Sequence, residues 1–357
     1  MKYATPVIKK DQPDDNYKFR PLPLPTGKYP YHLSLSAIIP DASADRLVFH
    51  LTGDTGSVRR PESQKGVIDE MTAQYTIANA PNFLYHLGDL VYHYGEASQY
   101  EAQFFKPYEN YPGPIFAIAG NHDSDVNPDS APYNSLDAFT KVFCDISQHP
   151  IAFSGNSRRK SMPQPNIYWA LDTPVATIIG LHSNVPKYGI ITPEQREWFI
   201  AELKAADPDK MLIVCVHHAP YSADINHGSS LYMIELLNGA YKEADIRPDI
   251  VFSGHVHNYQ RFSKANSDGT NTPYIVAGAG GFDELHSIAS LEDDRFTNHS
   301  PLFNGVKLES YCDDRHGFLK ITITKQSTGL SLAGEYYSVN STTNKALLSD
   351  SFMLHKG

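Results

Sequence analysis

Short hydrophobic runs alternate with longer amphipathic stretches through most of the chain. Apolar runs that stop at Gly, Asn, Asp or His are typical of buried strands, so we predict strands at residues 47–51, 83–87, 115–118, 175–181, 211–216 and 250–252. Residues 64–79 have a helical pattern. Thr192-Pro193-Glu194-Gln195 is a capping box with proline at the first helical position, which predicts a helix to residue 205. This alternation indicates an α/β protein whose central strands are buried on both faces.

The two ends of the chain and one internal region have other patterns. Residues 1–40 include Pro21-Leu22-Pro23-Leu24-Pro25, which favours an extended arm, and we predict one domain over residues 41–357. Residues 318–324 and 331–338 are expected to form further strands, antiparallel to their neighbours. Residues 124–165 are polar and are expected to be a long insertion, to which we assign no element.

Composition narrows the possible classes of protein. Among 357 residues, 30 are Lys or Arg and 40 are Asp or Glu, a net charge of −10 that gives no electrostatic basis for binding nucleic acid or an anionic membrane. Cys144, Cys215 and Cys312 have no C-x-x-C spacing, which argues against a disulfide scaffold or a zinc knuckle, and Cys215 is expected to be a buried thiol. The first residues have no apolar leader segment, so we expect a cytoplasmic protein, or a secreted or periplasmic one if a leader was removed.

Five polar clusters stand where the predicted strands end. Open α/β sheets place their sites at the carboxyl ends of strands, so these clusters are candidates for one shared site. They are Asp54-Thr55-Gly56, Gly88-Asp89-Leu90-Val91-Tyr92, Gly120-Asn121-His122-Asp123, Val214-Cys215-Val216-His217 and Gly254-His255-Val256-His257.

The order and spacing of these clusters resemble the calcineurin-like metallophosphoesterases, and within them the purple acid phosphatase branch. Most of that superfamily has a D-x-H first motif, but here Gly56 stands in place of the histidine and Tyr92 follows Asp89 by three residues. Pro273-Tyr274-Ile275-Val276 and the glycine-rich 277–281 also resemble the segment that follows the last motif of that family. The resemblance implies a four-layer α/β/β/α sandwich with two mixed central sheets.

The resemblance also implies a binuclear metal site. Asp54, Tyr92 and His257 would bind the first metal ion, Asn121, His217 and His255 the second, and Asp89 would bridge the two. Carboxylate and phenolate oxygens are hard ligands that suit Fe(III), whereas two imidazoles with an amide suit divalent Fe, Zn or Mn. Two such ions stabilise both ends of an in-line phosphoryl displacement and ionise a water molecule near neutral pH.

Two further histidines match positions that contact the substrate in the resembling family. His122 would contact the phosphate, and His227 would protonate the leaving-group oxygen, although its distance from His217 differs by about one residue from the family pattern. His218 is the alternative to His217 as a ligand, but the V-x-x-H register favours His217. Structural or solvent-exposed roles are expected for His50, His86, His93, His149, His182 and His286, and Arg59 and Arg60 are expected to be solvated.

These features predict a hydrolase that cleaves phosphate monoesters of small molecules or phosphoproteins. A phosphodiesterase or nucleotide hydrolase with the same metal site is the alternative within this class. A non-catalytic metal-binding scaffold is the alternative from another class. The sequence leaves the physiological substrate, the oligomeric state and the identity of the divalent ion open.

Overall fold

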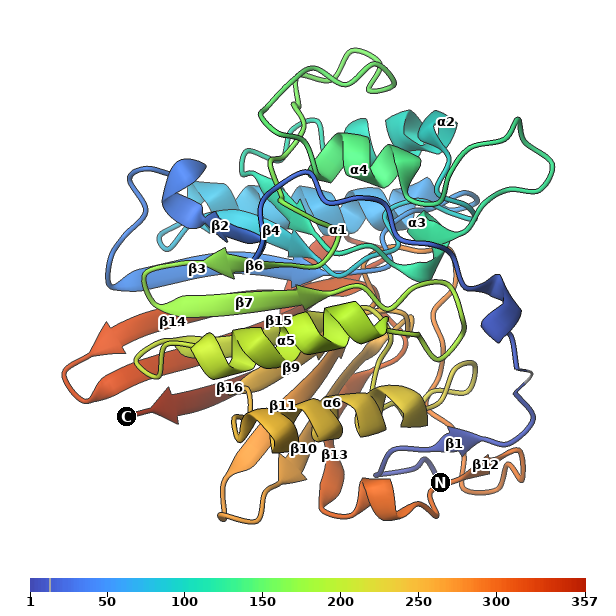
Figure 1. Cartoon of the computed structure of the whole chain (residues 1–357). Coiled ribbons are helices and arrows are strands. Elements are labelled where there is room, and N and C mark those ends of the chain that lie inside the picture. The colour runs from blue at the N-terminus through green and yellow to red at the C-terminus, as the bar shows by residue number, and fades with distance from the viewer. Residues whose placement is uncertain (13) are drawn as a thin grey trace.

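Two mixed β-sheets lie face to face in the computed structural model, which describes residues 1–12 and 14–357 (Figure 1). The eight-stranded sheet has, in spatial order, β13 (Val306–Cys312), β10 (Tyr259–Ala265), β11 (Asn271–Ala277), β9 (Ile250–Ser253), β8 (Met211–Val216), β7 (Ala176–Leu181), β6 (Trp169–Asp172) and β2 (His32–Ser34). The six-stranded sheet has β16 (Lys345–Lys356), β15 (Gly329–Asn340), β14 (Gly317–Gln326), β3 (Arg46–Thr52), β4 (Phe83–His86) and β5 (Ile115–Ala117). A separate ribbon pairs β1 (Ile8–Lys9) with β12 (Phe296–Thr297).

Helices cover the outer faces of both sheets. α1 (Pro61–Ala73), α2 (Ala97–Tyr100) and α4 (Asp137–Phe143) lie beside the six-stranded sheet, and α5 (Pro193–Ala205) and α6 (Leu231–Ala244) lie beside the eight-stranded one (Figure 1). Trp198 and Leu203 of α5 belong to the same buried cluster as Val214 of β8. The short helices are α3 (Asn121–Ser124), the 3-10 turns η1 (Asn16–Lys18), η2 (Leu35–Ala37), η3 (Gln74–Thr76) and η5 (Pro301–Phe303), and the π-helical η4 (Glu101–Phe105). The four-layer sandwich implied by the resemblance is therefore confirmed.

Aromatic side chains fill the space between the sheets. The ring of Trp169 in β6 lies 6.1 Å from that of Tyr85 in β4 and 5.8 Å from that of Phe116 in β5, measured between centroids. Gly180 in β7 makes room for this contact, because a Cβ atom there would lie 2.4 Å from Tyr85 Oη and 2.7 Å from Ile118 Cγ2. The two sheets thus approach closely where their parallel strands end.

The parallel strands direct their carboxyl ends to one edge of the molecule. β3, β4 and β5 are parallel neighbours in one sheet, and β7, β8, β9 and β11 are parallel neighbours in the other. Since the sheets stack face to face, the loops that follow these strands meet at a common edge. This is the edge at which the polar clusters of the sequence stand.

The six strands predicted from apolar runs are present within one residue at either end. The helix predicted at residues 64–79 instead begins at Pro61 and ends at Ala73, because Pro61 occupies a first-turn position and a 3-10 turn follows. The predicted capping box forms only in part: Thr192 Oγ1 accepts a hydrogen bond from the Gln195 amide (3.3 Å), but the Gln195 side chain bonds the backbone of His182. Residues 124–165, to which no element was assigned, contain α4.

The segment predicted as an extended arm runs along the body of the protein and contributes the edge strand β2.

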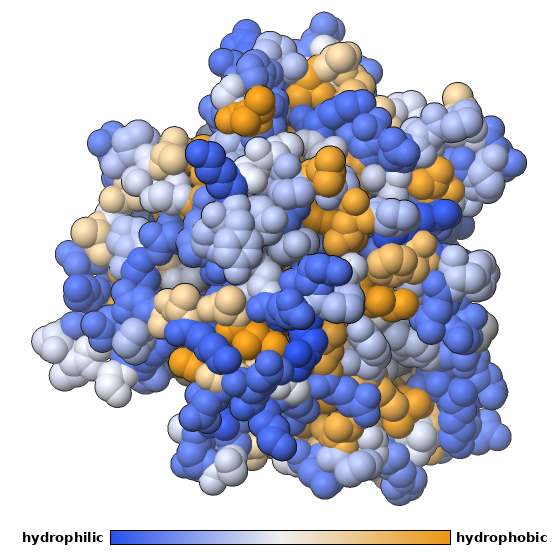
Figure 2. All heavy atoms as spheres, in the orientation of Figure 1, coloured by the Kyte–Doolittle hydropathy of each residue, from blue (hydrophilic) through white to orange (hydrophobic). Residues whose placement is uncertain are grey.

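None of the helices in the described part of the chain combines the length and hydrophobicity needed to cross a bilayer. On the face seen in Figure 2, hydrophobic side chains form small groups among hydrophilic ones.

The close approach of the sheets at Gly180 predicts a large cost for any side chain there. We expect Gly180→Val to lower the free energy of unfolding by about 1–3 kcal/mol, because Tyr85 and Ile118 must move within a packed interior. The matched control is Gly239→Ala in α6, where only the tip of the Arg196 side chain lies within 4 Å of the added Cβ and a gain of about 0.4–1 kcal/mol is expected. Urea unfolding of both variants measures this difference, and an unchanged stability for Gly180→Val would contradict the packing described.

Candidate metal centre

All seven predicted metal ligands converge at the carboxyl edge of the two sheets. Asp54 follows β3, Asp89 follows β4, and Asn121 begins α3 after β5, while His217 follows β8 and both His255 and His257 follow β9. Three of these residues have a left-handed backbone, with φ of 57° at Asp54, 55° at Asp89 and 66° at His255. Non-glycine residues rarely adopt this conformation, and such turns concentrate at functional sites.

Four donor atoms form a first group. Tyr92 Oη lies 3.1 Å from Asp89 Oδ2, 3.3 Å from Asp54 Oδ1 and 3.4 Å from His257 Nε2. His257 Nε2 is also 3.6 Å from Asp54 Oδ1. Ligand atoms about 2.1 Å from one metal ion lie about 3.0–3.4 Å apart in octahedral and tetrahedral sites, so these four atoms have nearly the spacing that a shared ion requires.

A second group shares Asp89 with the first. Asn121 Oδ1 lies 3.1 Å from His217 Nε2 and 2.9 Å from His255 Nδ1. Asp89 Oδ2 is 3.4 Å from His217 Nε2, and Asp89, His217 and His255 each offer a ligand atom within 4.8 Å of the others. The two groups therefore meet at one carboxylate, as the bridging assignment of Asp89 requires.

Hydrogen bonds on the far side of the imidazoles set which nitrogen faces the site. His217 Nδ1 is 2.8 Å from the Leu87 carbonyl oxygen, and His257 Nδ1 is 3.2 Å from that of Glu284. A carbonyl oxygen accepts only, so each Nδ1 carries a proton and each Nε2 is directed at the donor group. The neighbours of His217 Nε2 are hydrogen-bond acceptors, namely Asn121 Oδ1 and Asp89 Oδ2. This arrangement is favourable only if a positive charge lies between the nitrogen and these oxygens.

The shifted pKa values of the buried groups indicate the same need for positive charge. Burial, with a smaller contribution from Asp89, raises the pKa of Asp54 well above its usual value, and burial likewise raises the pKa of Tyr92. Burial lowers the pKa of His217, but the Asp89 carboxylate outweighs it and raises that pKa to about 9. A proton thus supplies the positive charge beside Asp89, and metal binding would displace it.

Gly56 and Gln103 fix the position of the tyrosine. A Cβ atom at residue 56 would lie 2.9 Å from Tyr92 Cδ2 and 2.7 Å from Gln103 Oε1, so a histidine would not fit there beside this tyrosine. Gln103 bonds both backbone groups of Tyr92, accepting from its amide (2.9 Å) and donating to its carbonyl (2.7 Å). The exchange of histidine for tyrosine that the motifs indicate therefore has a steric basis.

Asp123 links two of the loops that carry ligands. Its buried carboxylate accepts hydrogen bonds from four backbone amides, those of Asp89 (2.8 Å), Leu90 (3.0 Å), Val91 (3.3 Å) and Gly120 (2.8 Å). Burial and the Asp89 carboxylate raise the pKa of Asp123 to about 7. The sequence shows that Asp123 follows His122, but no sequence pattern indicates that Asp123 organises these loops. The role of Gln103 likewise could not be predicted from the sequence.

The two predicted substrate-contacting histidines each lie against the ring of a predicted metal ligand. The His122 ring centroid is 4.4 Å from that of Tyr92, and its Nδ1 is 2.7 Å from the His93 carbonyl oxygen, which leaves Nε2 free of that bond. The His227 centroid is 4.0 Å from that of His255, and its buried Nδ1 has no partner among the described residues. Burial lowers the pKa of His227 well below 6.5, so its ring is neutral in this arrangement.

Other histidines are placed by ordinary contacts. His218 Nδ1 is 2.7 Å from Ser183 Oγ, outside both donor groups, which agrees with the choice of His217. His50 bonds Tyr111 and Gln74, and His86 bonds Thr55. His286, for which a structural or solvent-exposed role is expected, stacks on His257 with a centroid distance of 4.4 Å. Arg59 is solvated as expected, with 63% of its side chain exposed, and it also contacts Asp283 and Glu284.

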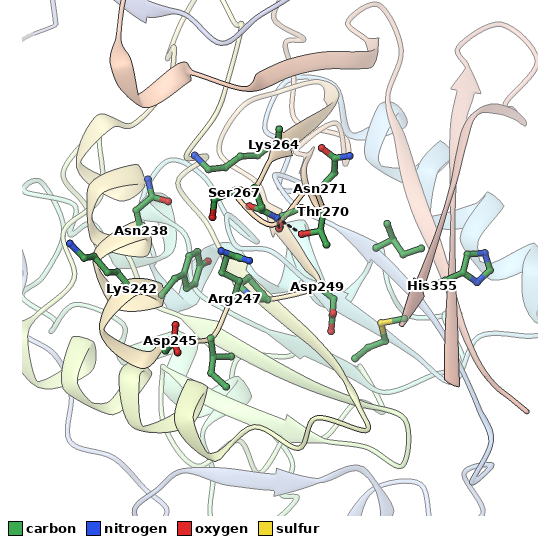
Figure 3. A pocket seen from close by; sticks show the side chains of 18 residues that line it. Asn238, Lys242, Asp245, Arg247, Asp249, Lys264, Ser267, Thr270, Asn271 and His355 are labelled. Carbon is green, nitrogen blue, oxygen red and sulfur yellow. Dashed lines mark hydrogen bonds between the residues drawn. The ribbon is translucent and has the colours of Figure 1, made fainter. Parts of the chain in front are cut away.

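A cavity of about 720 Å³ lies at the other edge of the eight-stranded sheet (Figure 3). It is lined by Met211 and Asp249, at the amino ends of β8 and β9, together with Lys242, Arg247 and Lys264. None of the predicted site residues lines it. The chemistry predicted from the motifs therefore belongs to the carboxyl edge and not to this cavity.

Comparison with known proteins agrees with the geometry. Residues 47–259 match the calcineurin-like phosphoesterase family, and the chain belongs to that family. This segment begins in β3 and ends at the start of β10, and it contains all nine predicted site residues.

The chain is also similar to plant purple acid phosphatases, which supports the purple-acid-phosphatase-like branch that Gly56 and Tyr92 indicate. It is 29% identical to purple acid phosphatase 1 of Ipomoea batatas over 196 residues, covering 48% of this chain and 37% of that protein. It is 30% identical to the Fe(3+)-Zn(2+) purple acid phosphatase 12 of Arabidopsis thaliana over 190 residues, covering the same shares. The matched segment thus spans about a third of the length of these relatives.

Two solved structures share the fold. The GAP50 anchor of the inner membrane complex of Plasmodium has a TM-score of 0.58 at 14% identity, covering 88% of this chain and 90% of that chain. PhoD has a TM-score of 0.55 at 12% identity, covering 88% of this chain and 70% of that chain. At these identities the likeness supports the fold alone.

The role of Asp123 predicts a loss of both stability and metal binding when its carboxylate is removed. We expect Asp123→Ala to lower the free energy of unfolding by about 3 kcal/mol or more, because four buried amides lose their acceptor. The exposed Asp129 in the same segment is the control, and Asp129→Ala should change stability by less than about 0.5 kcal/mol. Denaturant unfolding and elemental analysis test both variants. Full metal content and normal stability in Asp123→Ala would show that Asp123 does not organise the site.

Proposed function

We propose that this protein is a binuclear metallohydrolase that cleaves phosphate monoesters of small molecules or phosphoproteins. The observation that carries the proposal is the arrangement of seven donor side chains in two groups that share Asp89. Membership of the calcineurin-like phosphoesterase family and similarity to purple acid phosphatases support the same activity.

The chemistry of the donors supports different metals in the two groups. Asp54, Tyr92, Asp89 and His257 supply carboxylate and phenolate oxygens to the first group, which favours Fe(III). Asn121, His217, His255 and the shared Asp89 suit a divalent ion, which would be Fe, Zn or Mn. When bound, such a pair of ions would supply an ionised water nucleophile near neutral pH and would neutralise charge on the phosphoryl group.

The chain's own residues would orient the ester and handle the proton. His122, with Nδ1 held by the His93 carbonyl, directs its other nitrogen away from that bond and is suited to contact a phosphate oxygen. His227 is buried against His255 with an unpartnered Nδ1, and a phosphate dianion beside it would favour the imidazolium that protonates a leaving alkoxide. We assign these two residues to substrate contact and leaving-group protonation.

A comparison of esters tests the proposed activity. Purified protein should hydrolyse a chromogenic phosphate monoester faster than the corresponding diester, and a chelator should abolish turnover that added Fe and Zn then restore. Preference for the diester would favour the phosphodiesterase alternative. Bound metal without turnover of either ester would favour the non-catalytic scaffold.

The assignment of Tyr92 predicts a colour. A phenolate bound to Fe(III) gives a charge-transfer band in the visible, so the iron-loaded protein should be purple to pink. Tyr92→Phe should lose the band while the remaining donors retain some metal, which absorption spectra with elemental analysis would measure. A colourless iron-loaded wild type, or a band that persists in Tyr92→Phe, would exclude Tyr92 as a ligand.

The assignment of His227 predicts a dependence on the leaving group. We expect His227→Ala to reduce turnover of an alkyl phosphate by about 10²–10⁴-fold, because the poor leaving group needs a proton. The loss should be much smaller for an activated aryl phosphate. Steady-state kinetics on the two esters measure the ratio. Equal losses, or none, would rule out His227 as the proton donor.

A further inference from the structure

The loop that carries His227 has contacts on two sides with segments distant in sequence. Residues 222–229 lie between the end of β8 and the start of α6. On one side, the Ile225 amide donates to the Ser287 carbonyl (3.1 Å) and the Ala289 amide donates to the Ala223 carbonyl (2.7 Å). The N-terminal arm forms the other side.

The arm bonds this loop at four points. The Val7 amide donates to the Ser222 carbonyl (2.8 Å), and the Ser229 amide donates to the Val7 carbonyl (2.8 Å). Lys9 Nζ donates to the Asn226 carbonyl (2.9 Å), and Gln12 Nε2 donates to the carbonyl of His227 itself (2.6 Å). The bonded loop residues range from Ser222, before His227, to Ser229, after it. The arm therefore restrains the loop on both sides of His227.

Gly228 allows the arm to come this close. Its φ is +69°, and a Cβ atom there would lie 3.0 Å from the Lys9 amide nitrogen and 3.3 Å from the Val7 carbonyl oxygen. The left-handed backbone favours glycine, and the missing side chain leaves the space that the arm fills. The contact between the arm and the loop thus requires glycine at position 228.

The arm is itself held in place. β1 pairs with β12, and the buried side chains of Tyr3 and Val7 form a cluster with Phe296. Towards α6, a cavity of about 490 Å³, lined by Ile8, Gln12 and Leu231 among others, separates the arm from the body. The arm therefore holds the loop through directed hydrogen bonds and not through continuous packing.

We propose that residues 7–12 of the N-terminal arm position His227 beside the second donor group, with Gln12 as the positioning residue. Its side chain bonds the His227 carbonyl, and the Asp224 side chain bonds the His227 amide (2.7 Å), so the backbone of His227 is held at both polar groups. Any effect of the arm on catalysis rests on the proposed function of His227. The placement of the loop by the arm does not depend on that function.

The test compares Gln12→Met, which keeps the length of the side chain and removes its donor, with Lys10→Met. Lys10 lies in the same arm, but its Nζ bonds the Asp294 carbonyl on the other side, away from the loop. Hydrogen exchange of amides 224–229 in the metal-loaded protein should accelerate about tenfold or more in Gln12→Met and stay unchanged in Lys10→Met. A second variant, Gly228→Ala, which displaces the arm at Lys9, should accelerate exchange in the same amides.

Kinetics then test the role in catalysis. Gln12→Met should retain wild-type metal content, lose about tenfold in kcat for an alkyl phosphate and change less than about twofold for an activated aryl phosphate. Unchanged exchange in both Gln12→Met and Gly228→Ala would overturn the positioning, as would faster exchange with kinetics identical to wild type on both esters. If the wild type hydrolyses neither ester, the proposed function fails, and the exchange data alone decide whether the arm holds the loop.

Discussion

The structure depends most on the enclosure of three acidic groups in one small volume. Asp54, Asp89 and Tyr92 are each at most 1% exposed, and the Tyr92 hydroxyl lies within hydrogen-bonding distance of both carboxylates. An unpaired buried charge costs several kcal/mol, and adjacent like charges add to that cost. Cations between these groups would remove the penalty, so a site that is unfavourable as protein alone would become favourable with metal bound. Burial of these groups raises the pKa values of Asp54 and Tyr92, as this energetic cost requires.

The surrounding fold keeps these acidic side chains close together although their negative charges repel one another. Parallel strands from two stacked sheets bring the loops to one edge, and left-handed turns at Asp54, Asp89 and His255 direct them inward. Behind the donors, the Leu87 carbonyl fixes the orientation of His217, and Gln103 holds the backbone of Tyr92. These hydrogen-bond partners restrict the motion of the donor side chains and so preserve the spacing that the two proposed ions would require.

The sequence predicted the local parts of this arrangement well and the long-range parts poorly. Strands such as 211–216 are marked by continuous apolar runs, and the ligand motifs stand directly after them. β16 was missed because most of its side chains are exposed or half-buried, which leaves a weak hydrophobic signal. Asp123, Gln103 and Gln12 act through hydrogen bonds to backbone groups, and such bonds carry no pattern in a single sequence. The stacking of His286 on His257 likewise depends on how two loops meet in space.

The central claim is that one carboxylate joins two metal ions, and counting metal ions tests it most directly. Elemental analysis of the wild type, prepared with iron and zinc in excess and then desalted, should give two ions per chain. Asp89→Asn removes the shared charge while keeping the shape of the side chain, and the folded variant should retain fewer than one ion per chain. A wild type that saturates at a single ion, or an Asp89→Asn variant that keeps both, would contradict the account.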